Sequence, residues 1–211
     1  MNQAIVNILK PSHYQTFDLI KGDRRDSDSA SKYALSQLDF FNLRGKSILD
    51  VGSNAGYFLF KLAPKGPSKM VGIEIGQKFV QISNDLNTHH YKVPNLEFIL
   101  GDFFTHSFAE TFDFIICFST FHYFGYKQAE FFTKCHSILN DKGTLLVEIE
   151  EMPRNDRPAF EVDPRDPNRI YPNEKQIALY TKDSFKLLSQ YMSVRQKGSV
   201  YDRWFYEFVK S

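Results

Sequence analysis

A short glycine-rich segment after an apolar run holds the residues best suited to chemistry. It reads Leu49-Asp50-Val51-Gly52-Ser53-Asn54-Ala55-Gly56-Tyr57-Phe58. Gly52 and Gly56 permit a tight turn and a close approach to a ligand, and the helix expected next offers unpaired N–H groups. The carboxylate of Asp50 suits a ligand with an ammonium group and would repel a diphosphate. The alternative is a strand–helix turn that binds nothing.

The dinucleotide fingerprint G-x-G-x-x-G is not matched in this turn. Asn54 takes the place of the middle glycine, and Tyr57 takes the place of the last one. Both substitutions disfavour the close packing of a pyrophosphate. A nicotinamide-dependent reductase therefore ranks last among the functions that we consider.

Two further acids follow the next two predicted strands. Glu74 ends the second strand, where a carboxylate can accept both hydroxyl groups of a ribose. Asp102 ends the third strand in Gly101-Asp102-Phe103, where it can accept an adenine amino group with Phe103 beside the ring. The alternatives are an exposed strand-end acid for Glu74 and a turn aspartate for Asp102.

These motifs, the strand at Phe112-Asp113 and the turn Leu139-Asn140-Asp141-Lys142-Gly143 together resemble class I S-adenosylmethionine-dependent methyltransferases over about Gly45 to Glu151. The resemblance implies a seven-stranded sheet whose last strand is antiparallel, with S-adenosyl-L-methionine as cofactor. Asn54 stands where the family commonly has glycine. The implied contacts are Asp50 and Gly52 at the methionine end, Glu74 at the ribose, Ile75, Asp102 and Phe103 at the adenine, and Phe118 and Ser119 near the methionine moiety and the methyl group. Ser53, Asn54 and Gly56 of the turn are further cofactor-binding candidates.

His122 is the candidate general base, in Ser119-Thr120-Phe121-His122-Tyr123-Phe124 after the fourth strand. Methyl transfer mainly requires alignment of the acceptor, and a base is needed only where an oxygen or nitrogen acceptor must lose a proton. Tyr123 is a second catalytic candidate, for positioning. The alternative is a structural histidine. We expect no metal site, because the other histidines and the two cysteines, Cys117 and Cys135, lack metal-ligand spacing.

Short apolar runs alternate with amphipathic segments, which predicts an α/β, doubly wound, mostly parallel sheet. The predicted strands are Ser47–Val51, Lys69–Ile75, Leu96–Leu100, Phe112–Phe118 and Gly143–Ile149. The predicted helices are Ala30–Phe41, Ala55–Ala63, Gln77–His90 and Lys127–Leu139.

The segment Met152–Pro172 interrupts this alternation with five prolines, so we expect a surface loop or a lid and no regular core element. Its arginines Arg154, Arg157, Arg165 and Arg169 either bind an acidic acceptor group or are solvated. A helix at Thr181–Tyr191 with Thr181 as N-cap, then strands at Val194–Val200 and Arg203–Val209 joined by Tyr201-Asp202, are predicted to follow. The expected organisation is one domain over 1–211, with an N-terminal cap (1–44), a cofactor-binding core (45–151), the loop or lid (152–175) and a C-terminal helix and hairpin (176–211).

The composition is that of a globular chain of 211 residues, 42% of them hydrophobic, with a formal net charge of +1. This balance lacks the basic excess typical of nucleic-acid binding, and neither a signal peptide nor a membrane span is apparent. We therefore expect a cytoplasmic enzyme, with no membrane partner, that methylates a small molecule such as a sugar or secondary metabolite. The alternatives are an RNA (tRNA)-modifying methyltransferase and a non-catalytic S-adenosylmethionine-binding partner protein. The oligomeric state stays open.

Overall fold

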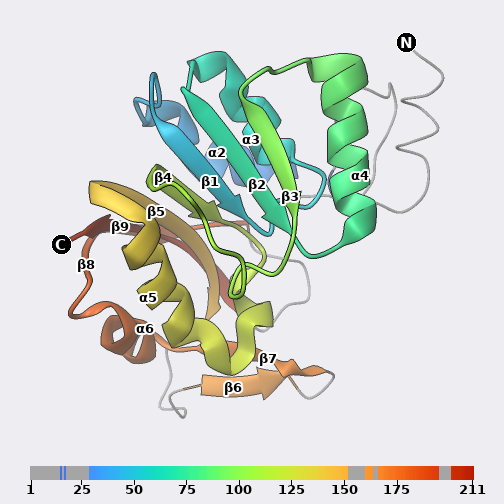
Figure 1. Cartoon of the computed structure of the whole chain (residues 1–211). Helices are drawn as coiled ribbons and strands as arrows, with labels where there is room; N and C mark the ends of the chain where they lie inside the picture. The colour runs from blue at the N-terminus through green and yellow to red at the C-terminus, as the bar shows by residue number, and fades with distance from the viewer. Residues whose placement is uncertain (1–14, 16, 18–28, 152–159, 164–165, 195–200) are drawn as a thin grey trace. The chain divides into compact units, whose positions relative to one another are not determined.

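Two compact units make up the chain. The computed structural model describes residues 15, 17, 29–151, 160–163, 166–194 and 201–211 (Figure 1). The first unit is Met1–His106 and the second is Ser107–Ser211. Each unit combines strands with helices, as the alternation in the sequence predicts.

The strands of the main sheet are β1 (Ser47–Val51), β2 (Lys69–Glu74), β3 (Leu96–Leu100), β4 (Phe112–Cys117), β5 (Leu139–Glu151), β8 (Phe185–Met192) and β9 (Asp202–Lys210). The seven strands are arranged in the order β3-β2-β1-β4-β5-β9-β8. Within the units, β1, β2 and β3 are parallel and so are β4 and β5, whereas β9 is antiparallel to β5. The predicted Rossmann-like class, with a mostly parallel sheet and an antiparallel last strand, is confirmed.

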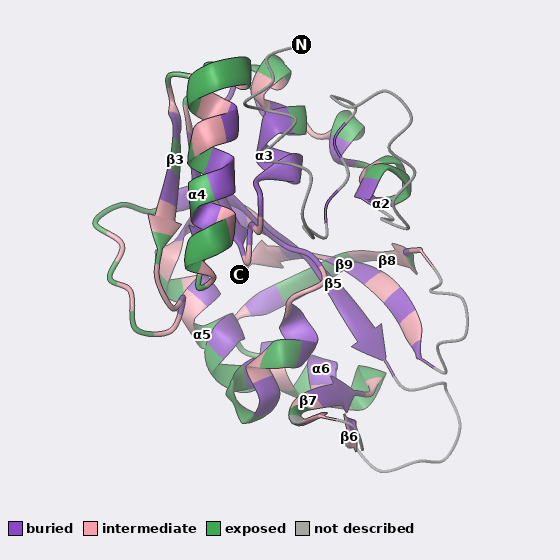
Figure 2. Ribbon diagram, turned by 90° about the vertical axis from the view of Figure 1, so that its right-hand side faces the viewer, coloured by how far each residue is buried: buried purple, intermediate pink, exposed green. Residues whose placement is uncertain are grey.

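The first unit agrees closely with the predicted elements. The strands Ser47–Val51 and Leu96–Leu100 are confirmed as predicted, and the strand from Lys69 ends at Glu74, one residue early. The α-helices among its described residues are α2 (Ser29–Leu35), α3 (Tyr57–Leu62) and α4 (Gln77–Leu86). Figure 2 shows α4 with buried residues along one side and exposed residues along the other, as expected for an amphipathic helix that covers a sheet.

Left-handed backbone positions explain where the predicted helices are shortened. Gly56 has φ +84°, so α3 begins at Tyr57 and not at Ala55. Gln37 has φ +57°, which separates α2 from a short 3₁₀ turn at Leu38–Phe40. The helix predicted for Gln77–His90 is α4 followed by a π-turn, and it ends where Lys92 adopts φ +53°.

The second unit is built around β4, β5 and an aromatic core. A 3₁₀ segment, η4 (Phe121–Lys127), and α5 (Gln128–Ile138) connect the two strands. The ring of Phe132, on α5, lies 5.6 Å from that of Phe121 and 5.7 Å from that of Phe208, so much of the chain's phenylalanine content fills this core. Among the described residues, no helix is long and apolar enough to cross a bilayer.

The prediction for the C-terminal region is wrong in two respects. The helix α6 covers Glu174–Thr181, so Thr181 ends it, and its N-cap is Asn173, whose side chain accepts from the Gln176 N–H. Residues 185–191 of the predicted helix belong instead to β8, which pairs with β9. The strand predicted for Val194–Val200 falls almost wholly on residues 195–200, which the structure does not describe. Local sequence permitted a helix at β8, but the hydrogen bonds offered by β9 outweigh that weak preference.

The proline-rich segment is also more regular than expected. Strands β6 (Phe160–Asp163) and β7 (Asp166–Pro172) form an antiparallel hairpin. Ile170 and Tyr171 on β7 are buried, so this part is neither a plain loop nor excluded from the core. Of the prolines of this segment that the structure describes, Pro167 is the second residue of β7 and Pro172 is its last, and a missing N–H is tolerated near strand ends. The predictions for Arg154, Arg157 and Arg165 concern residues outside the described part of the chain.

Candidate functional site

The glycine-rich turn of the first unit is left-handed at three alternate positions. The φ values are +75° at Gly52, +50° at Asn54 and +84° at Gly56. Asparagine is among the few non-glycine residues that adopt this conformation readily, because its short side chain bonds locally. The Asn54 carboxamide oxygen accepts from the Ala55 N–H at 2.9 Å. Asn54 is thus compatible with the backbone conformation that glycine commonly provides.

Gly56 is required for space as well as for conformation. A Cβ atom built there would lie 2.4 Å from Cζ and 2.7 Å from Cε1 of Phe98, whose ring comes from β3. Phe98 is buried, so its ring cannot move aside freely. The turn is consequently packed directly against the aromatic core of the first unit.

Every backbone N–H from Gly52 to Tyr57 has an acceptor inside the first unit. The pairs are Gly52 and Ser53 with the Ile73 carbonyl, Asn54 with Glu74 Oε2, Ala55 with Asn54 Oδ1, Gly56 with the Ser53 carbonyl, and Tyr57 with Gln15 Oε1. A phosphate-binding turn leaves such groups for its ligand. Because this turn uses them internally, the geometry supports the sequence argument against a dinucleotide.

Gln15 is a functional candidate that sequence reasoning missed. Its amide oxygen accepts from the Tyr57 N–H at 3.1 Å, and its amide nitrogen donates to the Ser53 carbonyl at 3.4 Å. The side chain is buried and bonds both ends of the turn. Its contact with the turn could not be read from neighbouring residues, because its partners lie about 40 residues away in the sequence.

Asp50 has an unsatisfied carboxylate in a buried position. It is 2% exposed, and its Oδ2 and the nearby Ser53 Oγ have no hydrogen-bond partner among the described residues. Burial, together with the neighbouring carboxylate of Glu74, raises the pKa of Asp50 to about 8. A buried acid without a partner is costly, and a cationic ligand group would stabilise its charged form. The residues present therefore fit the ammonium end of a ligand.

The other two candidate acids of the first unit, Glu74 and Asp102, lie at the ends of neighbouring parallel strands. Glu74 accepts from the Gly76 N–H at 2.8 Å and from the Asn54 N–H at 3.0 Å, which ties the end of β2 to the turn after β1. Asp102 follows β3, is half-buried and accepts from the Phe104 N–H at 2.8 Å. The register of β1, β2 and β3 brings these strand ends to one edge. Ile75 is 72% exposed, which leaves its side chain available for contact.

Phe103 and Phe118 are core residues of their own units. Phe103 is buried with its ring edge-on to Phe104 at 5.6 Å. Phe118 is buried with its ring edge-on to Phe205 at 5.1 Å. Their side chains shape the surroundings of the strand ends, and their contacts with a cofactor remain predictions.

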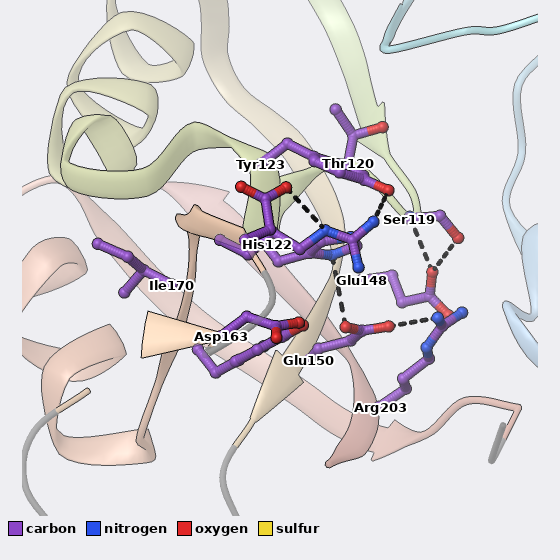
Figure 3. Close-up of polar contacts among 12 residues, drawn as sticks. Ser119, Thr120, His122, Tyr123, Glu148, Glu150, Asp163, Ile170 and Arg203 are labelled. Carbon is purple, nitrogen blue, oxygen red and sulfur yellow. Dashed lines mark hydrogen bonds and ion pairs between the residues drawn. The ribbon is translucent and has the colours of Figure 1, made fainter. Parts of the chain in front are cut away.

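Ser119 is held in a strained conformation by Glu148 in the second unit. Its φ is +54°, which a serine seldom adopts. Glu148 Oε2 accepts from the Ser119 N–H at 2.9 Å and from its hydroxyl at 3.1 Å (Figure 3). Glu148 Oε1 accepts from the Ser193 hydroxyl. This buried carboxylate therefore fixes the path of the chain after β4.

His122 lies beside a second buried carboxylate. Its Nδ1 is 3.7 Å from Glu150 Oε2, and Glu150 Oε1 forms an ion pair with Arg203 (Figure 3). The side chains of Glu150 and Arg203 are each 8% exposed. Sequence reasoning missed Glu148 and Glu150. The available signal was the pair of charged residues in the apolar run that became β5.

Tyr123, next to His122, faces outward and binds an arginine of the hairpin. It is 52% exposed. The Arg169 guanidinium lies 4.3 Å from the centre of the Tyr123 ring and donates to its hydroxyl, while Arg169 Nε is 3.7 Å from Asp166 Oδ2. Of the four arginines named from the sequence, Arg169 is therefore placed beside a candidate site residue and is not merely solvated. Among the described residues, no group of acids, histidines and cysteines has the geometry for a metal ion.

Comparisons with known proteins identify a family and relatives. The family model described as "Methyltransferase domain" matches residues 42–193. A tRNA U34 carboxymethyltransferase of Campylobacter fetus is 27% identical over 165 residues, covering 77% of this chain and 54% of the relative. That of Campylobacter hominis is 33% identical over 79 residues, covering 37% of this chain and 27% of the relative. The chain thus spans about half the length, or less, of these curated relatives.

Solved structures share the fold. Magnesium protoporphyrin IX methyltransferase from Synechocystis PCC 6803, crystallised with bound SAM, superposes with a TM-score of 0.66 at 18% identity, covering 87% of this chain and 78% of that one. At this identity the likeness concerns the fold alone.

Proposed function

The chain belongs to the methyltransferase-domain family, and we propose that it methylates an oxygen or nitrogen atom of a small-molecule acceptor. It is an S-adenosyl-L-methionine-dependent enzyme. The observation that carries the acceptor proposal is the buried histidine, His122, placed beside a carboxylate. A general base of this kind is needed where the acceptor carries a proton that must leave.

The residues of the first unit fit the cofactor by their chemistry. Asp50 provides a buried carboxylate for the ammonium group, and its Oδ2 has no hydrogen-bond partner among the described residues. Glu74 provides oxygens for ribose hydroxyls, and Asp102 an acceptor for the adenine amino group, with Ile75 and Phe103 as apolar neighbours. The cofactor supplies a methyl group on a positively charged sulfur, which makes that carbon electrophilic. Phe118 and Ser119 stay proposed neighbours of the methionine moiety.

The second unit provides the proposed acceptor chemistry. His122 takes the acceptor proton, and Tyr123 with Arg169 positions the acceptor through an aromatic face and a cation. The side chain of His122 is only 5% exposed. A buried base excludes water and favours an acceptor whose reactive group is small and can reach inward.

A tRNA acceptor is the second candidate, because the curated relatives are tRNA U34 carboxymethyltransferases. One feature favours the small molecule over it: the net charge of +1 lacks the basic excess that phosphate contacts require. The group transferred is proposed to be methyl, because the family model that matches the chain is described as a methyltransferase domain.

Calorimetry tests the cofactor, with S-adenosylmethionine, S-adenosylhomocysteine and NAD as ligands. We expect binding of the two sulfur compounds, and no binding of either would overturn the assignment. Glu74→Ala should weaken binding about tenfold or more, because it removes charge-assisted hydrogen bonds worth roughly 1.5–3 kcal/mol. Glu97→Ala, an exposed glutamate on β3, is the matched control and should bind normally.

Transfer of a labelled methyl group tests the acceptor, with low-molecular-weight extract and unmodified tRNA offered separately. Label in the small-molecule fraction supports the proposal, whereas label only in tRNA would replace it with the second candidate. No label in either, with cofactor bound, would favour a non-catalytic binding protein. His122→Ala should lower turnover about 10²–10⁴-fold while leaving cofactor affinity unchanged, and equal turnover would remove His122 from the mechanism.

A further inference from the structure

The imidazole of His122, the carboxylate of Glu150 and the guanidinium of Arg203 lie in succession in the second unit (Figure 3). Building on the base role proposed for His122, we propose that Glu150 is a positioning residue that fixes the imidazole with its proton on Nδ1 and the basic lone pair on Nε2, and that Arg203 sets how strongly it does so. The three residues come from different elements: Glu150 lies on β5, His122 on η4 and Arg203 on β9. Their proximity is therefore a product of the fold.

The strand register explains why these groups meet. Glu150 pairs with Arg203 across the antiparallel ladder of β5 and β9, which places both side chains on the same face. The two carboxylate oxygens are divided between the neighbours: Oε1 faces Arg203 and Oε2 faces Nδ1 of His122 at 3.7 Å. That distance is longer than a hydrogen bond, as is common for catalytic pairs before the substrate is bound.

Glu150 is the one carboxylate of β5 that is arranged for this task. Glu148 is occupied by Ser119 and Ser193, and Glu151 accepts from the Tyr206 hydroxyl. A carboxylate at Nδ1 selects the tautomer with hydrogen on that nitrogen and stabilises the imidazolium formed when the base takes a proton. The proton of the acceptor therefore moves to Nε2, and the Nδ1 proton stays on the imidazole.

Arg203 opposes the effect of Glu150 on the histidine. Its guanidinium neutralises part of the carboxylate charge, so the imidazolium is stabilised less than it would be beside an unpaired acid. Among the described residues, Tyr123 and Tyr171 also lie near His122, at 4.3 Å and 6.1 Å between ring centres. Burial raises the pKa of Tyr171, which keeps that phenol neutral, and its hydroxyl donates to Asp163. Arg169, over Tyr123, adds a cation on the outer side.

Opposite pKa shifts of His122 follow from these charges. Glu150→Gln removes the anion and should lower the pKa of His122 by about one unit or more. Arg203→Met leaves the whole carboxylate facing the imidazole and should raise that pKa. Arg203→Lys keeps the charge and should restore nearly the wild-type value. A merely structural role for the ion pair would shift the pKa in the same direction, or not at all, in both single variants.

Nuclear magnetic resonance of protein with ¹⁵N-labelled histidine measures tautomer and pKa directly, without a substrate. His122 is assigned by the loss of its signals in His122→Asn. We expect the Nδ1–H tautomer in the wild type and the two opposite shifts. Glu207→Gln is the matched control, since this half-buried glutamate of β9 binds Ser189 and should leave His122 unaltered. An Nε2–H tautomer in the wild type, or equal pKa values in Glu150→Gln and Arg203→Met, would overturn the proposal.

A buried carboxylate without its cation can prevent folding, so a second variant is needed in case Arg203→Met does not fold. The double variant Glu150→Gln/Arg203→Met removes both charges and should show the lowered pKa of Glu150→Gln. A wild-type pKa in a folded double variant would contradict the proposal. Activity separates this inference from the proposed function. If His122→Ala keeps full turnover while the opposite pKa shifts occur, the base role of His122 fails and the positioning role of Glu150 stands. If His122→Ala loses turnover while the opposite pKa shifts are absent, only the positioning role of Glu150 fails.

Discussion

The turn after β1 and the face of β5 treat buried polar groups in opposite ways. In the turn of the first unit, each N–H from Gly52 to Tyr57 is satisfied by the protein, yet the carboxylate Oδ2 of Asp50 has no partner among the described residues. On β5 of the second unit, the carboxylates of Glu148, Glu150 and Glu151 all have side-chain partners.

The carboxylate of Asp50 is therefore suited to bind a ligand, whereas the carboxylates of β5 orient other residues of the protein. An unpartnered buried acid destabilises the ligand-free protein, and a cation relieves that cost. A paired buried acid instead fixes its neighbours, and removing one partner exposes the full cost of the other. The first unit is therefore expected to respond to cofactor, and the second to mutation of its internal partners.

The largest expected effect concerns the packing that holds the turn. Gly56→Ala should destabilise the protein by about 2–5 kcal/mol, because it adds backbone strain and overlaps the Phe98 ring. Gly45→Ala, at φ +72° with open space around the new Cβ, isolates the strain and should cost about 1–3 kcal/mol. Chemical denaturation measures both, and equal losses would mean that the contact with Phe98 is unimportant.

Next in size is the loss of a paired carboxylate in the second unit. Glu148→Gln should lower the free energy of unfolding by roughly 1.5–3 kcal/mol, since the two Ser119 donors lose a charged acceptor. Glu207→Gln makes the same change at a half-buried position with a single serine partner and should cost less. If both variants unfold at the same denaturant concentration, Glu148 does not hold the chain after β4.

Asp50→Asn should differ from Glu148→Gln: it should cause little loss of stability but weaker cofactor binding. The neutral amide removes the charge that an ammonium group requires, and we expect affinity to fall about tenfold or more, equal to roughly 1.5–3 kcal/mol. Asp85→Asn, on α4 of the same unit, serves as the control. Unchanged affinity by calorimetry in a folded Asp50→Asn protein would show that this carboxylate does not bind the cofactor.

The smallest effect is a pH dependence of binding. With a pKa of about 8, Asp50 is largely protonated at neutral pH in the ligand-free protein, and a cation lowers that pKa. Binding should therefore release up to about one proton and strengthen as pH rises toward about 8, above which an α-amino group itself loses charge. Calorimetry in buffers of different ionisation enthalpy measures the release, which should vanish in Asp50→Asn.

Local patterns predicted the first unit well because its site residues are close in sequence to the strands that carry them. Asp50, Glu74 and Asp102 each stand at or just beyond a strand whose apolar run is plain, and parallel strands bring their ends together. The same logic failed at β8, where Phe185–Met192 was predicted as helix. A segment of mixed pattern takes its structure from the neighbour that supplies hydrogen bonds, which here is β9.

By itself, the sequence determined the fold class, the glycine-rich turn and the acids at the strand ends, since short-range periodicity and backbone conformation encode these features. Only the tertiary structure decided that Gln15 binds the turn, that Glu148 holds Ser119, and that Glu150 lies between His122 and Arg203. These contacts depend on strand register and on the burial of charges, which bring partners from distant segments together. The spacing of neighbouring residues in the sequence predicts neither the register nor the burial.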